Sequence, residues 1–367
     1  MSNGDLLKKI YDLKSIYDDG SKTTTSSYNF DKATFIGGKN IIITGTPGCG
    51  KSYYVQNELL KNYPKDTQGE FTTVIRTTFF PEYSNTDFVG QLLPQVQNKT
   101  LSDGTQQSTV TYDFIPGPFT LALQCAIENP GKPVALVIEE INRGNAASIF
   151  GDIFQLLDRK KDGSQIGSSM YSIVNTNIQR YLTKFFEKSD GYIFNKIMIP
   201  ANLSIFATMN SSDQNVFTLD TAFQRRWDKM RLKNQFNPGP DWKDYFVPGM
   251  GDVTWEDLVL TINQYIVSKP DLFMNEDKQL GIYFIDKDTL CEEKFDINNS
   301  LDKEKMEKFG SKILEYLWND ISKFDHNFIF SDVNTLDDML TKYEKLSSNN
   351  QGEQIFSEDL RGKLTSK

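Results

Sequence analysis

The stretch "GTPGCGKS" at residues 45–52 constrains the fold of this chain more than any other feature. It directly follows the apolar run "IIIT", and a helical pattern, "KSYYVQNELLKNY", begins inside it. Gly45, Gly50, Lys51 and Ser52 match the spacing G-x-x-x-x-G-K-[ST], in which backbone N–H groups wrap around phosphate oxygens. Glycine is needed because a Cβ would block the approach of a phosphate. The sequence therefore predicts a buried strand, a phosphate-binding loop (P-loop) and a helix, in that order.

Each part of this loop has an expected role toward a nucleoside triphosphate. Lys51 is predicted to contact the β- and γ-phosphates, and Ser52 to ligate Mg²⁺. The helix that begins near Lys51 adds the positive end of its dipole. Cys49 fills a variable position and is predicted to be inert. The residues predicted to bind the nucleotide are Gly45, Thr46, Pro47, Gly48, Cys49, Gly50, Lys51, Ser52 and Tyr53.

Short apolar strands alternate with helical patterns from about residue 36 to residue 232. Strands are predicted in "KNIIITG", "FTTVIRTTF", "PVALVIEEI" and "NLSIFATMN". This alternation is typical of a mainly parallel sheet covered by helices on both faces. Further on, "TWEDLVLTINQYIVS" and "EKFGSKILEYLWNDISKF" have the apolar spacing of amphipathic helices. The predicted fold class is an α/β P-loop NTPase core followed by a smaller helical lid domain.

Four regions are predicted along the chain. Residues 1–35 hold a short amphipathic helix at 5–17 and a polar linker. Residues 36–235 form the nucleotide-binding core and residues 236–345 form the helical lid. Residues 346–367 are expected to be a weakly structured tail.

Composition excludes several classes of function. The net charge of -9 and the pI near 4.9 argue against a broad basic surface that grips DNA by itself. The single histidine, His326, excludes histidine triads and two-histidine metal sites, and it is predicted to be structural. The three scattered cysteines form neither a disulfide framework nor a CxxC metal site. There is no membrane-length apolar run and no signal-peptide pattern, so the cytoplasm is the expected location and no membrane partner is expected.

The strand "ALVIEE" ends in two acidic residues, Glu139 and Glu140. Glu139 is predicted to hold the water shell of Mg²⁺, although Asp is usual at this position. Glu140 is predicted to polarise the water that attacks the γ-phosphate. A solvent-exposed acidic strand end would have the same sequence, but the upstream P-loop favours the catalytic interpretation.

Two further polar features follow. Asn210 ends the strand "IFATM" and is predicted to orient the attacking water. Arg225 and Arg226, in "LDTAFQRRWDKM", are candidates for a guanidinium that neutralises charge on the transferred phosphoryl group and that can act in trans. An isolated Asn is usually a turn former, and an isolated Arg pair usually lies on the surface. Both interpretations therefore depend on the P-loop and the acidic pair, and the choice between the two arginines stays open.

Taken together, these residues resemble the AAA+ motor subunits of McrB type, from modification-dependent restriction systems. The resemblance covers about residues 36–330. It is carried by "FFPEYSNTDFVG" (79–90), "EEINRGNAASIFGDIFQLLD" (139–158), "ATMNSSDQNVFTLDTAFQRRW" (207–227) and, more loosely in the lid, "KQLGIYFI" (278–285) and "KILEYLWNDI" (312–321).

The resemblance implies an Mg²⁺-dependent NTPase that uses ATP or GTP and forms a homo-oligomeric ring, typically a hexamer. Arg225 or Arg226 would then act on the neighbour's nucleotide, with Asn210 as the sensor and Asp213 as a supporting acid. The resemblance also implies a separate nuclease subunit of McrC type as partner, with DNA bound through the complex. The chain itself has no cluster of acids and lysines typical of a nuclease, so it is predicted not to cut DNA.

Several positions depart from the family pattern. Glu139 replaces Asp, Gln214 and Gln224 stand where arginines are common, and residues 159–198 are longer than the short hairpin expected there. This segment would be a pore-facing or partner-facing element, or a decorative loop. Only about 35 residues precede the core, so a domain that reads modified DNA is expected on another chain.

Two other functions have the same nucleotide chemistry. A chaperone related to MoxR-type AAA+ proteins would remodel protein substrates and would not respond to DNA or a nuclease. A nucleotide-gated assembly protein would bind nucleotide but barely hydrolyse it, and Glu139 is the feature that points to it. The "NRGN" and "MNSSDQN" runs favour the restriction motor over the chaperone. The choice between ATP and GTP stays open, because no motif for base recognition is present.

Overall fold

The computed structural model describes residues 26–100, 106–210, 216–236, 239–268 and 278–365. The chain divides into two compact units that are interleaved in sequence. The first unit comprises Met1–Ile42, Leu60–Ala207 and Val216–Asp228, and the second comprises Ile43–Leu59, Thr208–Asn215 and Lys229–Lys367. The helix predicted at 5–17 lies outside the described residues, and the predicted domain boundaries stay a prediction.

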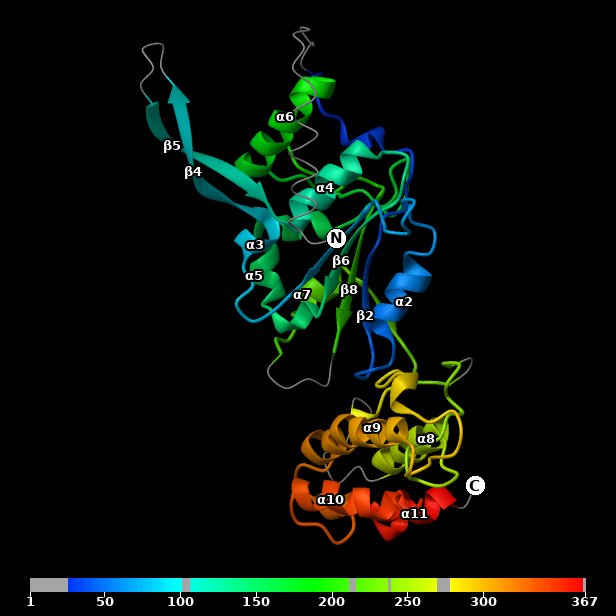
Figure 1. The fold of residues 1–367 in the computed structure, drawn as a ribbon. Coiled ribbons are helices and arrows are strands. Elements are labelled where there is room, and N and C mark those ends of the chain that lie inside the picture. The colour runs from blue at the N-terminus through cyan, green and yellow to red at the C-terminus, as the bar shows by residue number, and fades with distance from the viewer. Residues whose placement is uncertain (1–25, 101–105, 211–215, 237–238, 269–277, 366–367) are drawn as a thin grey trace. The chain divides into compact units, whose positions relative to one another are not determined.

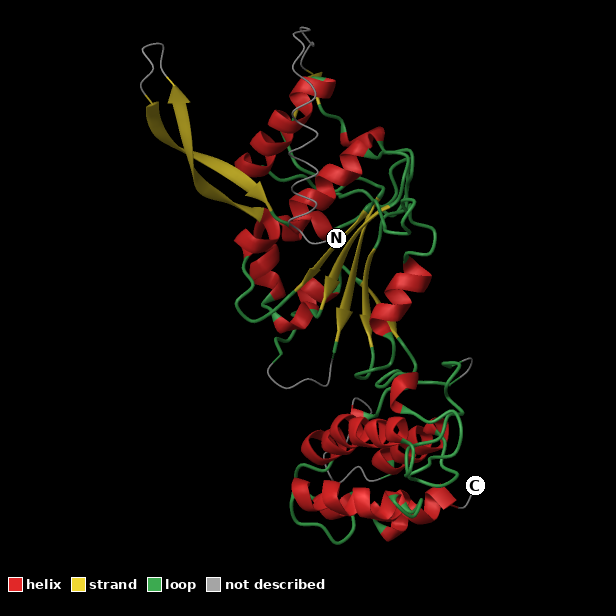
Figure 2. Ribbon diagram, viewed as in Figure 1, coloured by secondary structure: helices red, strands yellow, loops and turns green. Residues whose placement is uncertain are grey.

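A five-stranded sheet has the strand order β3-β6-β8-β2-β9. β3 pairs with β6 and β6 pairs with β8, both in parallel, and Figure 2 shows the arrows of the central strands running in one direction. The middle strands are buried almost throughout, which explains why their sequences are continuous apolar runs rather than alternating ones. The mainly parallel sheet of the predicted fold class is thus confirmed. Its strands are β2 (Asn40–Thr44), β3 (Val74–Thr78), β6 (Val134–Glu139), β8 (Leu203–Met209) and β9 (Asp228–Arg231).

Helices accompany the strands in the first unit (Figure 1). α4 (Pro118–Glu128) packs against β3 and β6, and nine of its eleven residues are buried. It begins with Pro118 in its first turn, where a missing N–H costs nothing, and it ends before the Asn-Pro-Gly sequence. The other helices of this unit are α3 (Asn85–Val89), α5 (Ala146–Phe150), α6 (Thr176–Asp190) and α7 (Thr221–Gln224).

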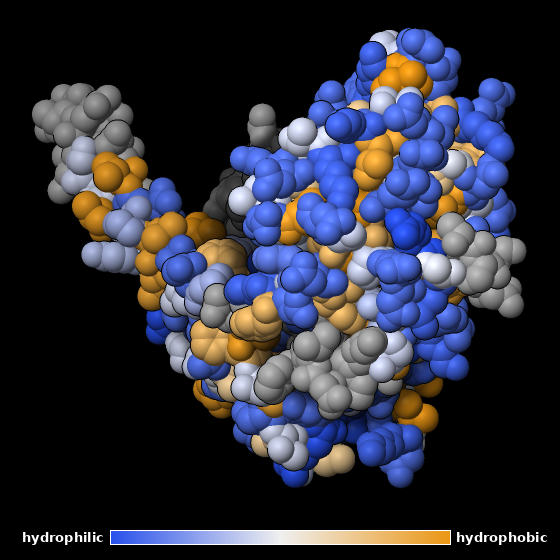
Figure 3. Space-filling view, turned by 90° about the horizontal axis from the view of Figure 1, so that it is seen from below, coloured by the Kyte–Doolittle hydropathy of each residue, from blue (hydrophilic) through white to orange (hydrophobic). Residues whose placement is uncertain are grey.

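A long hairpin that the sequence analysis missed projects from the first unit. β4 (Gly90–Thr100) and β5 (Gln106–Pro116) pair in antiparallel register (Figure 1). Directly opposed residues share one face of the ribbon, and one face carries the apolar pairs Leu92–Phe114, Pro94–Tyr112 and Val96–Val110. Five of these six residues are exposed, and Figure 3 shows apolar residues along the ribbon. The alternation in "VTYDF" is the period-two signal that predicts such a strand.

The long 159–198 segment contains a helix rather than only a loop. In α6, Ile178, Leu182 and Phe186 recur at four-residue steps and are buried. After α6 the chain forms β7 (Tyr192–Ile193), which pairs in parallel with β1 (Ser26–Ser27). The segment is therefore tied to the N-terminal part of the described chain.

The second unit is mainly helical after residue 229. Its core is built around Trp255, Leu258 and Ile262 of α8 (Trp255–Val267) and the buried residues of the helices that follow. Two π-helical segments, Gly310–Leu314 and Leu317–Ile321, extend the helix that begins as α9 (Ser300–Phe309). These elements confirm the predicted helical lid. None of the described helices is both long and apolar enough to cross a membrane.

The prediction of a weakly structured tail at 346–367 differs from the structure. α10 (Leu336–Ser347) is followed by a 3-10 turn at Gly352–Ile355 and by α11 (Glu358–Thr365). Ile355, Leu360 and Leu364 are buried in the helical core. These apolar side chains are too widely spaced in a polar stretch to reveal their burial from the sequence alone. His326, predicted to be structural, stacks on Trp318 with ring centroids 3.7 Å apart.

Candidate functional site

The P-loop joins β2 to α2 (Lys51–Tyr54), and the helix continues as a π-helical segment at Val55–Leu59. Gly48 and Gly50 have left-handed backbone conformations, with φ of 72° and 90°. A Cβ on Gly48 would lie 2.7 Å from Cα of Phe284, and one on Gly50 would lie 2.9 Å from Cδ2 of Tyr283. Both conformation and space therefore require glycine, as the sequence pattern indicates.

The lysine of the loop is held inside it. Lys51 is buried, and its Nζ donates to the carbonyl oxygens of Gly45 and Thr46 at 2.9 and 3.0 Å. The ammonium group thus lies against the loop that is predicted to bind phosphates. Ser52 follows on the exposed side of the first helical turn.

A segment of the lid, residues 280–284, lies directly against the P-loop within the second unit. The backbone N–H of Tyr283 donates to the carbonyl oxygen of Gly48 at 2.7 Å. A Cβ on Gly281 would lie 2.2 Å from both the carbonyl carbon of Gly48 and the carbonyl oxygen of Pro47. From the sequence, "KQLGIYFI" is only a loose likeness to the family and this contact was not predicted, although a glycine next to aromatic residues could have suggested it.

Buried hydrogen bonds hold this lid segment in place. Asn263 accepts from the N–H of Leu280 at 2.7 Å and donates to its carbonyl oxygen at 2.9 Å. Asn234 makes a second pair of bonds, to the carbonyl oxygen of Leu280 and the N–H of Ile282. Trp255 Nε1 donates to the carbonyl oxygen of Ile282 at 2.9 Å. The helical core of the lid therefore determines where the segment meets the P-loop.

The acidic pair lies at the end of β6 in the first unit. Glu139 pairs in register with Thr78 of β3, and its Oε1 lies 3.3 Å from Nη1 of Arg76. The carboxylate predicted to hold the water shell of Mg²⁺ thus has a cationic partner on the neighbouring strand. Arg76 was not among the residues predicted from the sequence, although it lies in the second predicted strand.

Glu140 has an unusual backbone conformation. Its φ of 56° and ψ of 49° are left-handed, which is rare for a residue with a side chain and costs on the order of 1 kcal/mol. Its Oε2 lies 3.5 Å from Nε of Arg143, and its side chain is only 25% exposed. Strain of this kind is concentrated at functional sites. Here the strained residue is the one predicted to polarise the attacking water.

Asn210 comes directly after the last residue of β8 and is partly buried. The residues that follow it, including Asp213 and Gln214, lie outside the described residues. The proposed roles of Asn210 and Asp213 stay predictions.

The two arginines after α7 have different surroundings within the first unit. Arg226 donates from Nε and Nη2 to Oδ2 of Asp158 at 3.0 and 2.8 Å, and its guanidinium lies 4.1 Å from the ring centroid of Phe154. Its side chain is only 10% exposed, whereas Arg225 is exposed. The sequence treats the two residues alike, and the structure separates an anchored arginine from an accessible one.

The thiol of Cys49 and possible clusters of metal ligands were the remaining candidates for site chemistry in the described part of the chain. Burial raises the pKa of the Cys49 thiol, so it stays protonated, as expected for an inert position. No group of three or more His, Cys, Asp or Glu side chains that could hold a metal ion occurs among the described residues. A magnesium ion bound at a P-loop does not need one, because phosphate and water oxygens supply most of its ligands.

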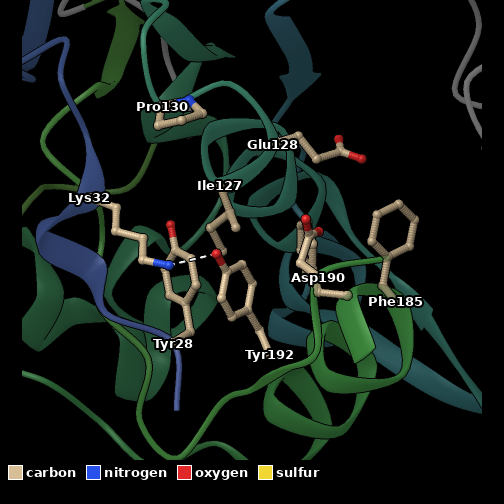
Figure 4. A pocket seen from close by; sticks show the side chains of 9 residues that line it. Tyr28, Lys32, Ile127, Glu128, Pro130, Phe185, Asp190 and Tyr192 are labelled. Atoms are coloured by element: carbon tan, nitrogen blue, oxygen red, sulfur yellow. Dashed lines mark hydrogen bonds between the residues drawn. The ribbon is translucent and has the colours of Figure 1, made fainter. Parts of the chain in front are cut away.

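A cavity of about 300 Å³ lies elsewhere in the first unit (Figure 4). Desolvation raises the pKa of Glu128 in its wall, and the nearby Asp190 carboxylate raises it further. Lys32 Nζ donates to the hydroxyl of Tyr192 across the pocket at 2.5 Å. None of the predicted nucleotide-site residues is in its lining, which comprises Tyr28, Lys32, Ile127, Glu128, Pro130, Phe185, Phe186, Asp190 and Tyr192.

Comparison with known proteins matches this chain to one protein family and to individual relatives. Residues 40–227 match the AAA domain family, dynein-related subfamily. This range includes the P-loop, the acidic pair and both arginines. Component YdiS of the type II restriction enzyme BsuMI, from Bacillus subtilis (strain 168), is 35% identical to this chain over 324 residues. That alignment covers 83% of this chain and 86% of YdiS.

A second relative matches over a shorter range. The EcoKMcrB subunit of a type IV methyl-directed restriction enzyme, from Escherichia coli (strain K12), is 25% identical over 209 residues. The alignment covers 57% of this chain and 38% of that protein. Both relatives are named as parts of restriction enzymes, and the first is similar over most of its length.

Proposed function

Because this chain belongs to the AAA+ family, as a McrB-like member, we propose that it is the nucleotide-hydrolysing motor subunit of a DNA restriction complex. The chain is an AAA+ ATPase related to restriction-system components. The observation that carries the proposal further is the alignment with YdiS over most of both chains. The names of both relatives favour the restriction class over the protein-remodelling class.

The P-loop residues fit a nucleoside triphosphate. Gly48 and Gly50 hold the left-handed backbone conformations of the loop, and Lys51 Nζ already lies against the carbonyl oxygens of Gly45 and Thr46. We expect Lys51 to exchange these acceptors for the β- and γ-phosphates, since a charge-assisted bond to phosphate is stronger than one to a neutral carbonyl. Gly45, Thr46, Pro47, Cys49 and Tyr53 complete the proposed binding loop.

Magnesium is the expected cofactor. Its ligands are oxygens, and Ser52 presents an exposed hydroxyl on the first turn after the P-loop. The ion would neutralise charge on the β- and γ-phosphates. Glu139 would hold part of its water shell, and its ion pair with Arg76 would orient the carboxylate.

Glu140 is the proposed general base. A base must lie within hydrogen-bonding reach of the attacking water, directly or through one water. Because the backbone of Glu140 is left-handed, its side chain points in another direction than it would if the strand continued. Nε of Arg143 lies 3.5 Å from its carboxylate. Asn210 is proposed to orient the same water.

Arg225 is the better candidate for action on a neighbouring subunit. An arginine supplied in trans must reach out from its own chain, and Arg225 is exposed. Arg226 is instead bound to Asp158 and covered by Phe154, so we assign it to holding the segment after α7 in place. This assignment supports a homo-oligomeric ring, with a hexamer as the proposed size.

The proposed partners are a separate McrC-like nuclease subunit and, through the complex, DNA. The net charge of -9 supports DNA binding by other parts of the complex, because it disfavours a broad DNA-binding surface on this chain itself. The chain is proposed to supply nucleotide energy and not to cut DNA.

The first test uses Glu140→Gln, which removes the base while keeping the shape of the side chain. The variant is incubated with Mg²⁺ and ATP or GTP, purified from its source cells, and its bound chains are identified by mass spectrometry. Recovery of a nuclease subunit would support the proposal. Recovery of a folded protein substrate without a nuclease would contradict it.

Hydrolysis is measured in parallel on the purified protein. Lys51→Ala should abolish phosphate release from both ATP and GTP, and persistence of turnover would refute the assigned site. Glu344→Gln and Lys345→Ala are control variants, because both residues are exposed on α10 and belong to neither the P-loop nor the acidic pair. Chelation of Mg²⁺ should stop turnover in the wild-type protein.

A further inference from the structure

Three aromatic side chains are gathered next to the P-loop within the second unit. Tyr53 directly follows Ser52 on the first turn of α2, and its side chain is 61% exposed. Its ring stacks on that of Tyr283, with centroids 5.8 Å apart and an interplanar angle of 14°. Trp242 meets the ring of Tyr283 edge-on, with centroids 6.2 Å apart.

This cluster is joined to the phosphate-binding loop itself. The N–H of Tyr283 donates to the carbonyl oxygen of Gly48, and Cδ2 of the Tyr283 ring would lie 2.9 Å from a Cβ on Gly50. Tyr53 is covalently two residues from Lys51. A ligand whose phosphates lie in the P-loop therefore has aromatic surface within reach of its other end.

The cluster also contains a polar group without a partner. Trp242 Nε1 is buried, and no acceptor for its N–H is found among the residues that the structure describes. A buried donor that lacks an acceptor costs free energy, which an acceptor on a ligand would recover. Partial burial, with Tyr53 and Asp241 nearby, raises the pKa of Tyr283, so its hydroxyl remains a neutral donor at physiological pH.

We propose that Tyr53, Tyr283 and Trp242 form the base subsite of the bound nucleoside triphosphate. The inference rests on the proposed function, since it concerns the same nucleotide. The base stacks on an outer face of the tyrosine pair rather than between the rings, because insertion would need planes about 7 Å apart. Trp242 Nε1 donates to an acceptor on the base or the ribose.

The ligand class that fits this subsite is a purine nucleotide without a choice between adenine and guanine. Stacking depends on the area of the ring system, and every base has a π face. Purines therefore bind more tightly than pyrimidines, and inorganic tripolyphosphate binds through the P-loop alone. Discrimination between ATP and GTP requires other groups.

The test compares the affinities of ATP, GTP, CTP and inorganic tripolyphosphate, each with Mg²⁺, by isothermal titration calorimetry. The variants are Tyr53→Ala and Tyr53→Phe, because an exposed side chain on a helix can be changed without unfolding the protein. Tyr112→Ala is the matched control, since Tyr112 is a similarly exposed tyrosine that belongs to the ribbon of the first unit and not to the aromatic cluster. Tyr283→Ala is measured as a second variant.

We expect Tyr53→Ala and Tyr283→Ala to weaken ATP and GTP binding by on the order of tenfold, the usual effect of losing one stacked ring. Their affinity for tripolyphosphate should equal that of the wild type, and Tyr53→Phe should retain nucleotide affinity. Binding of ATP, but not of tripolyphosphate, should change the tryptophan emission, and Trp242→Phe should remove that change.

Two results would overturn the inference while leaving the proposed function intact. If wild-type protein binds tripolyphosphate as tightly as ATP, the base makes no contact of its own. If Tyr53→Ala weakens tripolyphosphate and ATP equally, the tyrosine shapes the P-loop and does not touch the base. If the wild-type protein binds none of the four ligands, the proposed function fails as well.

Discussion

Arg225 and Arg226 are adjacent in sequence, and the structure predicts opposite consequences for their removal. Arg226→Ala deletes two charge-assisted hydrogen bonds to Asp158 and the contact with the ring of Phe154. Arg225→Ala deletes an exposed side chain. We expect the first change to lower stability and the second to lower turnover.

The magnitude for Arg226→Ala follows from its burial. Breaking a fully buried pair costs about 3–5 kcal/mol and an exposed pair about 0–1 kcal/mol. The side chains of Arg226 and Asp158 are 10% and 28% exposed, which places this pair between the two limits. A loss of about 2 kcal/mol, with about 1 kcal/mol more for the cation–π contact, gives about 3 kcal/mol in total. At about 2–4 °C for each kcal/mol, the Tm of the first unit should fall by roughly 6–12 °C.

The assay is thermal unfolding followed by tryptophan emission, combined with phosphate release at low temperature. Trp227 is the single tryptophan of the first unit and lies next to Arg226 in sequence, so its signal reports the unit that is affected. Arg225→Ala should leave Tm within about 1 °C, because exposed substitutions change stability by less than about 0.5 kcal/mol. Its turnover should fall on the order of a thousandfold, as for other arginines supplied in trans.

A double-mutant cycle with Asp158→Ala measures the pair itself, and a coupling free energy of about 2 kcal/mol is expected. The reasoning would be refuted if Arg226→Ala kept the wild-type Tm but lost turnover, while Arg225→Ala kept its turnover. The accessible and anchored roles would then have been assigned to the wrong residues.

Three further changes test the lid and the cavity. Gly281→Ala forces a Cβ against the backbone of the P-loop, so the free energy of unfolding in a urea titration should fall by about 1–3 kcal/mol. The same variant should bind nucleotide more weakly in a binding titration. Its control is Gly362→Ala, which has open space in α11 and should instead add up to about 1 kcal/mol. Asn263→Leu leaves the buried N–H of Leu280 without its acceptor and removes one of the two donors to the carbonyl oxygen of Leu280, so it should lower the free energy of unfolding by about 2 kcal/mol. The raised pKa of Glu128 means that its ionisation opposes folding, so stability is lost as pH rises through and above the ordinary value of 4.5. Glu128→Gln should therefore raise Tm at pH 7 and lose that advantage below about pH 4, and an equal gain at both pH values would contradict the linkage.

The strand–loop–helix around the P-loop could be predicted because its determinants are local. Glycines with left-handed backbone, an apolar strand and a helix start are all encoded within about fifteen residues. The buried strands β6 and β8 were predicted for a similar reason, since a strand covered on both faces needs an unbroken apolar run. The ribbon of β4 and β5 was missed although "VTYDF" alternates, because Pro94 lies within β4 and a proline argues against a strand.

The sequence by itself determined the α/β class, the P-loop and the acidic strand end, because spacing along one chain specifies backbone geometry and side-chain type. Only the tertiary structure decided that Gly281 and Tyr283, more than 200 residues beyond the loop, lie against Gly48 and Gly50. It also decided that Arg226 is anchored and Arg225 accessible. Such outcomes depend on which distant side chains share a surface, and packing between remote segments leaves no periodic signal in the sequence of either one.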